Sequence, residues 1–220
     1  MHPYPNQEAV GPEYIYGLFP QPVYFVNRGS FDYSGLDSTE QKEVTEIIEE
    51  GVKPNTHNQS TFNSYIFNER LGKLKQFCEQ ELKRYVKEII NPKYDLELYI
   101  TQSWINITKP GAAHHVHSHP NSIISGVFYI ETEEDDKITF VDPSCHLKNL
   151  ISIEREDFTI WNSDTWFFPA NAGELVLFPS WLRHKVEVNK KATTDRISLS
   201  FNTFAKGILG EKNDSSELIL

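Results

Sequence analysis

The stretch Leu96-Glu97-Leu98-Tyr99-Ile100-Thr101-Gln102-Ser103-Trp104-Ile105-Asn106-Ile107 decides the fold. Half of its residues are β-branched or aromatic, and no apolar stripe recurs at the three- and four-residue steps of a helix. The stretch follows Pro92 and predicts a long strand. From here to residue 204 the chain has the pattern of β structure.

Two helices are expected before this strand. Asp37 offers an N-cap, apolar residues follow at helical spacing, and Gly51 closes the segment. Between residues 61 and 91 apolar side chains again recur at helical steps, which predicts one long helix that ends before Pro92. The proline-rich first thirty-odd residues exclude a helix, and short strands are expected at 14–19 and 23–26.

Further β segments follow the long strand. The acidic run from Glu131 to Asp136 predicts a solvated hairpin turn, and the connection from Asp142 to Ala170 predicts a loop that shapes a binding site. The fold class is therefore mainly β, an antiparallel double sheet or jelly roll with helices that support one outer face. The predicted segments are 123–130, 138–141, 173–179 and 196–204.

The length of 220 residues predicts a single domain, 1–220. Within it we expect N-terminal strands and supporting helices over 1–95, a β core over 96–204 and a loosely held tail over 205–220. The formal net charge of −10, with no Lys- and Arg-rich stripe, argues against direct nucleic-acid binding. With no apolar run of membrane length and no signal-peptide pattern, a cytoplasmic location without membrane association is expected. The two cysteines, Cys78 and Cys145, indicate free thiols.

Four of the eight histidines lie in the six positions from His114 to His119. In an extended segment His115, His117 and His119 would share one face, and His114 would face away as an ordinary surface residue. Two imidazoles two residues apart can bind one metal ion, but the site needs at least a third protein ligand. The natural donor is His184, and the pair that joins it is either His117 and His119 or His115 and His117.

The last predicted strand, 196–204, alternates polar and apolar residues, so Arg196 and Ser198 share a face. A guanidinium beside a hydroxyl is suited to a bidentate hold on a carboxylate. Tyr129, on the strand from Ile123, could reach the same carboxylate. The alternative is that Arg196 forms an ordinary surface ion pair with a neighbouring acid, Asp195 or Glu174.

These residues together resemble a known family, the iron(II)- and 2-oxoglutarate-dependent oxygenases, and most closely a small phage and bacterial branch of it. The resemblance implies a double-stranded β-helix core, with iron(II) as cofactor, 2-oxoglutarate as co-substrate, dioxygen as oxidant and ascorbate as reductant. The similar stretches are 117–129, Asp142-Pro143, 178–184 and 196–202.

Carried over residue by residue, the resemblance implies that His117, His119 and His184 are the catalytic metal ligands. It implies that Arg196, helped by Ser198, binds the remote carboxylate of 2-oxoglutarate, and that Tyr129 and Asn106 are further co-substrate contacts. The family at large has His-x-Asp or His-x-Glu where this sequence has His-x-His, so either three histidines bind the iron or an acid such as Asp142 joins them.

The function that the resemblance implies is an oxygenase, most simply a hydroxylase, that converts 2-oxoglutarate to succinate while it oxidises a small molecule or a protein side chain. A bacterial or phage-infected cytoplasm and a homodimeric assembly go with this reading. Two alternatives stay open. One is a cupin-like three-histidine dioxygenase without 2-oxoglutarate, and the other is a non-enzymatic jelly-roll module that binds a metal or a partner.

Overall fold

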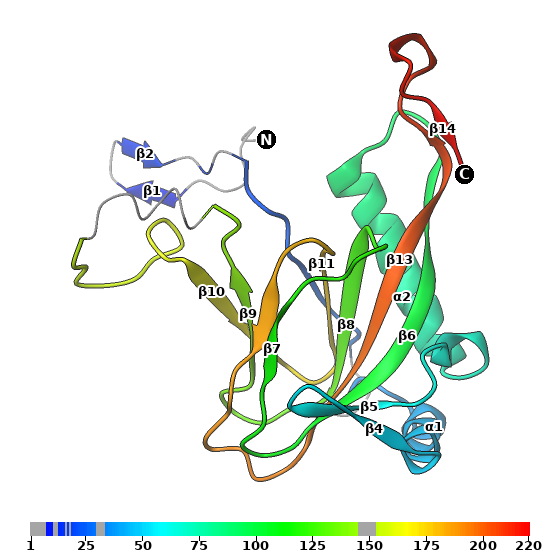
Figure 1. Ribbon diagram of the computed structural model, residues 1–220, viewed down its shortest axis with the longest axis vertical. Helices are drawn as coiled ribbons and strands as arrows, with labels where there is room; N and C mark the ends of the chain where they lie inside the picture. Colours follow the sequence, from blue (N-terminus) through cyan, green and yellow to red (C-terminus); the bar gives the residue numbers. More distant parts are fainter. Residues whose placement is uncertain (1–7, 11–12, 16, 18, 30–33, 145–152) are drawn as a thin grey trace.

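The protein folds around two antiparallel β-sheets that pack face to face (Figure 1). The computed structural model describes every residue except 1–7, 11–12, 16, 18, 30–33 and 145–152. The larger sheet has the strand order β3-β11-β8-β13-β6-β5-β4, with β14 added to the end of β13, and the smaller sheet has the order β10-β9-β12-β7. A short separate hairpin, β1-β2, lies near the N-terminus. The strands are β1 Glu8–Val10, β2 Glu13–Ile15, β3 Tyr24–Asn27, β4 Val52–Asn55, β5 Asn58–Thr61, β6 Leu96–Thr108, β7 His114–His117, β8 Ile124–Glu131, β9 Lys137–Val141, β10 Thr165–Pro169, β11 Glu174–Pro179, β12 His184–Val186, β13 Arg196–Leu209 and β14 Leu218–Ile219.

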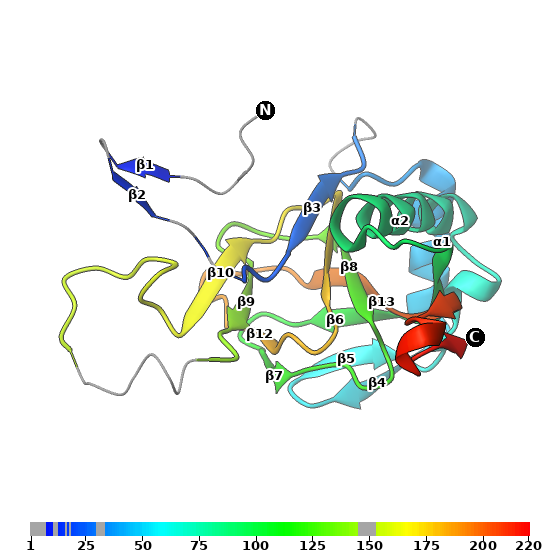
Figure 2. The ribbon, with the colours of Figure 1, turned by 90° about the horizontal axis from the view of Figure 1, so that it is seen from above.

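The two faces of the larger sheet have different partners. Leu199 and Phe201 of β13 point to the outer face, where they join a core cluster with the helices α1 (Ser38–Glu49) and α2 (Gly72–Tyr85). Both helices cover this face (Figure 2). Between the sheets, Tyr129 and Phe178 pack against Phe140 of the smaller sheet. The predicted mainly β architecture, with helices on one outer face, is confirmed.

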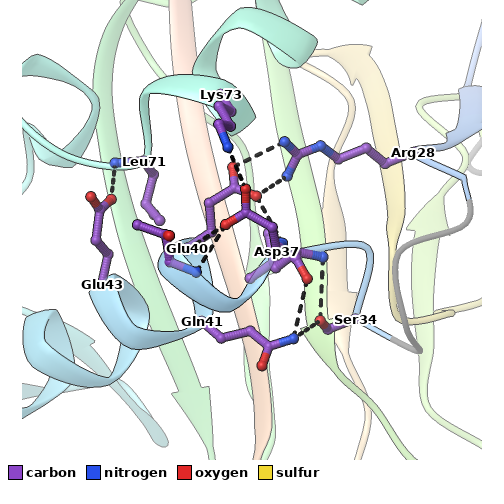
Figure 3. Close-up of polar contacts among 10 residues, drawn as sticks. Arg28, Ser34, Asp37, Glu40, Gln41, Glu43, Leu71 and Lys73 are labelled. Carbon is purple, nitrogen blue, oxygen red and sulfur yellow. Dashed lines mark hydrogen bonds and ion pairs between the residues drawn. The ribbon is translucent and has the colours of Figure 1, made fainter.

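The start of α1 is fixed by the capping residues that the sequence predicts (Figure 3). Asp37 accepts hydrogen bonds from the amides of Thr39 and Glu40, and the Glu40 carboxylate accepts one from the Asp37 amide, which completes a capping box. Arg28, just after β3, forms two 2.9 Å hydrogen bonds with Glu40, and both side chains are less than a tenth exposed. This buried pair ties β3 to the helix layer.

The long helix expected over residues 61–91 is wrong in its first third. Residues 58–61 form β5, Ile66–Asn68 form a 3₁₀ turn, and α2 begins only at Gly72. Side chains take up backbone amides here: the nearby Asn63 accepts a hydrogen bond from the Tyr65 amide, and Ser103 of the distant strand β6 accepts one from the Phe67 amide. After Tyr85 the chain continues as a π-helical turn, Val86–Ile90. This helical segment ends before Pro92, as predicted.

The acidic run 131–136 is not a hairpin turn. It joins β8 of the larger sheet to β9 of the smaller one, so it is a corner between sheets. Asp136 is buried, and Glu133 accepts four hydrogen bonds from the backbone and hydroxyls of the threonines at 193 and 194. These bonds, those from Thr194 most of all, lower the pKa of Glu133 to about 2. Sequence spacing alone does not distinguish a hairpin from a crossing between sheets.

The C-terminal segment is better ordered than expected. β13 runs on to Leu209, and β14 pairs with its end, so the tail folds back as a hairpin. Gly207 and Leu220 exchange backbone hydrogen bonds in this pairing. The expected strands near the N-terminus are found in part, as β2 and β3.

Two findings bear on the chain's surroundings. Among the residues that the structure describes, no helix is both long and apolar enough to cross a membrane. Cys78 is a buried free thiol in α2, and burial raises its pKa. Cys145, like His2 and His146, lies outside the described residues.

Candidate active site

A cavity of about 500 Å³ lies between the inner faces of the two sheets. Its walls come from strands far apart in the sequence, and every candidate site residue of the sequence lines it. The candidates are Asn106, His117, His119, Tyr129, His184, Arg196 and Ser198. A cavity of this size has the dimensions of a small-molecule site.

Three histidines meet at one side of the cavity. His117 ends β7, His184 begins the neighbouring strand β12, and the two residues are register partners. His119 lies two residues beyond β7, where its amide donates a hydrogen bond to the Ser180 carbonyl. One ligand atom from each ring lies within 4.8 Å of the other two. The sheet therefore brings together imidazoles that are 65 positions apart in the chain.

Hydrogen bonds to the backbone fix which ring nitrogens face one another. His184 Nδ1 lies 3.0 Å from the Leu182 carbonyl, and His117 Nδ1 lies 2.8 Å from the His115 carbonyl. A carbonyl accepts, so each Nδ1 carries the proton and each Nε2 keeps its lone pair for a metal. The arrangement is that of histidines oriented as ligands.

The geometry and charge of the cluster fit a divalent metal. Two bonds of about 2.1 Å at 90–109° place two nitrogens about 3.0 to 3.4 Å apart, and the Nε2 atoms of His119 and His184 are 3.3 Å apart. Burial lowers the pKa of His119 to about 4 and holds the pKa values of His117 and His184 below their usual range. The imidazoles are therefore neutral at pH 7, which is the form that binds metal.

The three-histidine cluster does not include His115, and His114 lies closer to it than expected. His115 is exposed and lines the cavity with its ring 5.2 Å from that of His117. The ring of His114 lies 4.4 Å from that of His117, and its buried Nδ1 has no hydrogen-bond partner among the described residues. The expectation that His114 faces away is wrong. A register shift between β7 and β12 pairs His184 with His117 but Val186 with His114, and this bulge breaks the simple alternation of a strand.

No carboxylate joins the three imidazoles among the residues that the structure describes. Asp142 instead accepts a hydrogen bond from the Ser144 amide, as a turn-forming residue does before a proline. Neutral imidazoles alone therefore make up the cluster.

Arg196 lies in the same cavity and has no acidic partner among the described residues. The two acids that could have paired with it are engaged elsewhere, Asp195 with Lys109 and Glu174 with Asn171. The side chain is buried, donates one hydrogen bond to the Lys137 carbonyl, and lies 5.1 Å from the centre of the Tyr129 ring. A buried guanidinium without a carboxylate is a ready anion-binding group.

Tyr129 completes this end of the cavity. Its ring is fully buried, and its hydroxyl has no hydrogen-bond partner within the described part of the chain. Desolvation raises its pKa to about 12, so the hydroxyl stays a donor at neutral pH. An unpaired buried hydroxyl costs about 1–3 kcal/mol, and a carboxylate bound to Arg196 would offset that cost.

Ser198 lies two residues after Arg196 on β13, and Asn106 lies opposite Ser198 on the neighbouring strand β6. Ser198 of β13 is the register partner of both Asn106 on β6 and Tyr129 on β8. The Asn106 amide donates to the Ser200 hydroxyl and accepts from the Trp104 indole, so its orientation is fixed. The structure thus places all four residues predicted for the co-substrate on one stretch of sheet.

Sequence reasoning missed a set of buried hydroxyls behind His119. Ser180 bonds to Ser122 at 2.7 Å and to Ser125 at 2.8 Å, and Ser125 donates to the Asn202 side chain. The Ser180 carbonyl accepts from the His119 amide, so this network positions the loop that carries the histidine. Isolated serines carry no signal that would reveal it.

The comparisons with known proteins agree with this geometry. Residues 102–202 match the sequence family described as "Putative 2OG-Fe(II) oxygenase". A search of curated protein sequences finds no match.

Solved structures share the fold at low sequence identity. A carbocyclase from nogalamycin biosynthesis, SnoK, described as α-ketoglutarate-dependent, is 16% identical with a TM-score of 0.56, over 83% of this chain and 79% of that one. A prolyl-4-hydroxylase from Pseudomonas putida is 13% identical with a TM-score of 0.53, over 83% and 92%. HygX from Streptomyces hygroscopicus, crystallised with nickel, 2-oxoglutarate and hygromycin B, is 11% identical with a TM-score of 0.53, over 83% and 82%.

A jelly-roll core whose cavity holds a three-histidine cluster is suited to a metal-dependent enzyme. Residues 102–202 are similar to the 2OG-Fe(II) oxygenase family, and this region carries every one of the seven cavity-lining candidates. The match and the histidine cluster indicate an enzyme that depends on iron(II) as cofactor and on 2-oxoglutarate as co-substrate.

Proposed function

We propose that His117, His119 and His184 bind the iron(II), and that Arg196 pairs with the distal carboxylate of 2-oxoglutarate. The Tyr129 hydroxyl donates a hydrogen bond to the same carboxylate, while Ser198 and Asn106 line the space between carboxylate and metal. One observation carries the proposal: three neutral imidazoles and an acid-free buried guanidinium converge on one cavity.

The residues of this chain have separate roles in the reaction. Iron(II) with 2-oxoglutarate and dioxygen supplies the oxidising equivalents that remove hydrogen from a C–H bond, and succinate and carbon dioxide are the by-products. The imidazoles donate lone pairs that their backbone hydrogen bonds keep directed inward. Arg196 and Tyr129 hold the co-substrate at a fixed depth, so that its keto-acid end lies toward the histidines.

The reaction outcome that we propose is hydroxylation of a small molecule or a protein side chain. The net charge of −10 opposes a nucleic-acid substrate, because phosphates would be repelled over most of the surface. We further propose a cytoplasmic enzyme of bacterial or phage origin, active as a monomer or a homodimer.

The three-histidine cluster also suits a cupin-like dioxygenase that needs no 2-oxoglutarate. Such an enzyme binds no 2-oxoglutarate, so its reaction does not require a buried arginine without an acidic partner beside a tyrosine hydroxyl without a hydrogen-bond partner. The Arg196 environment therefore favours the 2-oxoglutarate-dependent reaction over this alternative.

The test is succinate formation by the protein incubated with iron(II), ascorbate and 2-oxoglutarate in air. We expect slow succinate release even without a primary substrate, and its loss in Arg196→Ala. The matched control is Arg183→Ala, because Arg183 is exposed and lies outside the cavity lining, so this variant should match the wild type. Equal rates for both variants and the wild type would contradict the role of Arg196.

A further inference from the structure

The hairpin formed by β4 and β5 turns a polar face into the active-site cavity. Lys53 faces Ser60 across this hairpin, Asn55 faces Asn58, and all four residues line the cavity. The hairpin extends the larger sheet beyond β6 (Figures 1 and 2). Nothing in the proposed binding of iron or 2-oxoglutarate uses these four side chains.

Strand register connects this hairpin to the co-substrate end of the cavity. Lys53, Ser60, Asn106, Ser198 and Tyr129 are successive register partners on β4, β5, β6, β13 and β8. Adjacent strands are about 4.8 Å apart, so the four steps of this row span about 19 Å. A five-carbon dicarboxylate fills only part of such a row. The part of the cavity beside the β4–β5 hairpin therefore has room for a second molecule.

Among the described residues, the cavity wall carries positive charge and no negative charge. Its formally charged side chains there are Lys53 and Arg196, with no Asp or Glu, although the whole chain has 31 acidic and 21 basic residues. Within the described part of the chain, no carboxylate forms an ion pair with Lys53, which is exposed at the hairpin end. This lining favours an anion at both ends of the cavity.

Two unpaired polar atoms lie at the same end. The Asn58 side-chain oxygen and His114 Nδ1 are buried, and no described residue forms a hydrogen bond with either of them. The Asn58 oxygen accepts hydrogen bonds, and His114 Nδ1 accepts one in the neutral tautomer whose proton is on Nε2. The two atoms therefore suit a ligand that offers hydroxyl hydrogens.

We propose that the β4–β5 hairpin is the recognition wall for the primary substrate, and that this substrate is a small hydroxylated molecule bearing a phosphate or carboxylate group. Lys53 pairs with the anionic group, and Asn58 and His114 accept hydrogen bonds from its hydroxyls. This inference rests on the proposed function, since the substrate binds beside 2-oxoglutarate in the same cavity.

The test uses four matched probes that share the pyranose ring: glucose, glucose 6-phosphate, glucuronate and glucosamine. Each is titrated calorimetrically, without oxygen, into iron(II)-loaded protein that is already saturated with 2-oxoglutarate. An exposed ion pair is worth about fivefold in affinity. We therefore expect the phosphate, the carboxylate or both to bind about fivefold more tightly than glucose, and glucosamine to bind most weakly. Which anion binds more tightly identifies the group that Lys53 accepts.

Two variants connect the ranking to the hairpin. Lys53→Glu should remove or reverse the preference for anions, while Lys83→Glu, the same charge change on the exposed side of α2, should keep it. Asn58→Ala should weaken glucose and the anions alike by about fivefold, because one neutral hydrogen bond is lost.

The outcomes separate the two proposals. Three results, each obtained while 2-oxoglutarate binds, would overturn the recognition-wall proposal and leave the proposed function standing. No probe binds, or the anions bind no more tightly than glucose, or the Lys53→Glu variant ranks the probes as the wild type does. If 2-oxoglutarate itself fails to bind the loaded protein, both are wrong.

Discussion

Arg196 offers the sharpest quantitative prediction, because its environment allows the loss to be worked out. A carboxylate held by two charge-assisted hydrogen bonds gains about 1.5–3 kcal/mol from each. Arg196→Ala should therefore weaken 2-oxoglutarate binding by at least about 3 kcal/mol, which is roughly a 150-fold rise in Kd. Arg196→Lys keeps the charge but loses the planar fork, so one bond of about 1.5 kcal/mol is lost and Kd should rise roughly tenfold.

The measurement is anaerobic calorimetric titration of 2-oxoglutarate into the metal-loaded protein. The variants should remain folded, because within the described structure Arg196 makes one side-chain hydrogen bond, to the Lys137 carbonyl, and its ring neighbour is Tyr129. The exposed Arg183→Ala serves as control and should bind like the wild type. A Kd for Arg196→Ala within threefold of the wild-type value would refute the assignment of Arg196 as the carboxylate-binding residue.

Three further substitutions test the scaffold. Glu40→Ala should cost about 3–5 kcal/mol of unfolding free energy, measured by urea denaturation, because it leaves Arg28 buried without its partner and removes the capping box; a loss below 1 kcal/mol would contradict the structural role of the pair. Gly126→Ala should destabilise by about 1–3 kcal/mol, measured the same way, because a Cβ there would overlap the buried Phe201 ring, and an unchanged midpoint would show that the ring can move. The pKa of Glu133 is lower in the folded state than in the unfolded state, so its ionised carboxylate stabilises the fold above about pH 4.5, and this stabilisation is lost as the pH falls toward 2. Glu133→Gln should therefore flatten the fall in Tm over that range. Parallel Tm curves for the variant and the wild type would contradict this.

Much of the fold could be predicted because its elements carry local signals. The alternation in β13 separates Arg196 and Ser198 from Leu199, and the structure keeps them on opposite faces. Asp37 and its capping box mark the start of α1. These features depend on neighbours in the chain, which a sequence shows directly.

What could not be predicted depends on contacts between distant segments. Strand β4 of the hairpin has the polar stretch Lys53-Pro54-Asn55, with no apolar alternation, because these residues line the cavity. It becomes a pair of strands only because Ser60 pairs with Asn106 of β6. The corner at 131–136 likewise depends on which sheet receives β9, and the turn residues there are the same for either outcome.

The candidate site shows both cases. His117, His119 and His184 are conspicuous in the sequence, and the structure brings them together. The inward turn of His114 follows from a register shift opposite Val186, and no residue type in the stretch marks that bulge.

The central claim is that imidazoles from two separate stretches of the chain bind one metal ion. It is tested most directly by the metal content of the protein after equilibrium dialysis against iron(II) without oxygen. We predict one ion per chain for the wild type and for the control His115→Ala, and little or none for His117→Ala, His119→Ala and His184→Ala. Full metal content in His184→Ala, or its loss in His115→Ala with retention in His119→Ala, would contradict the account.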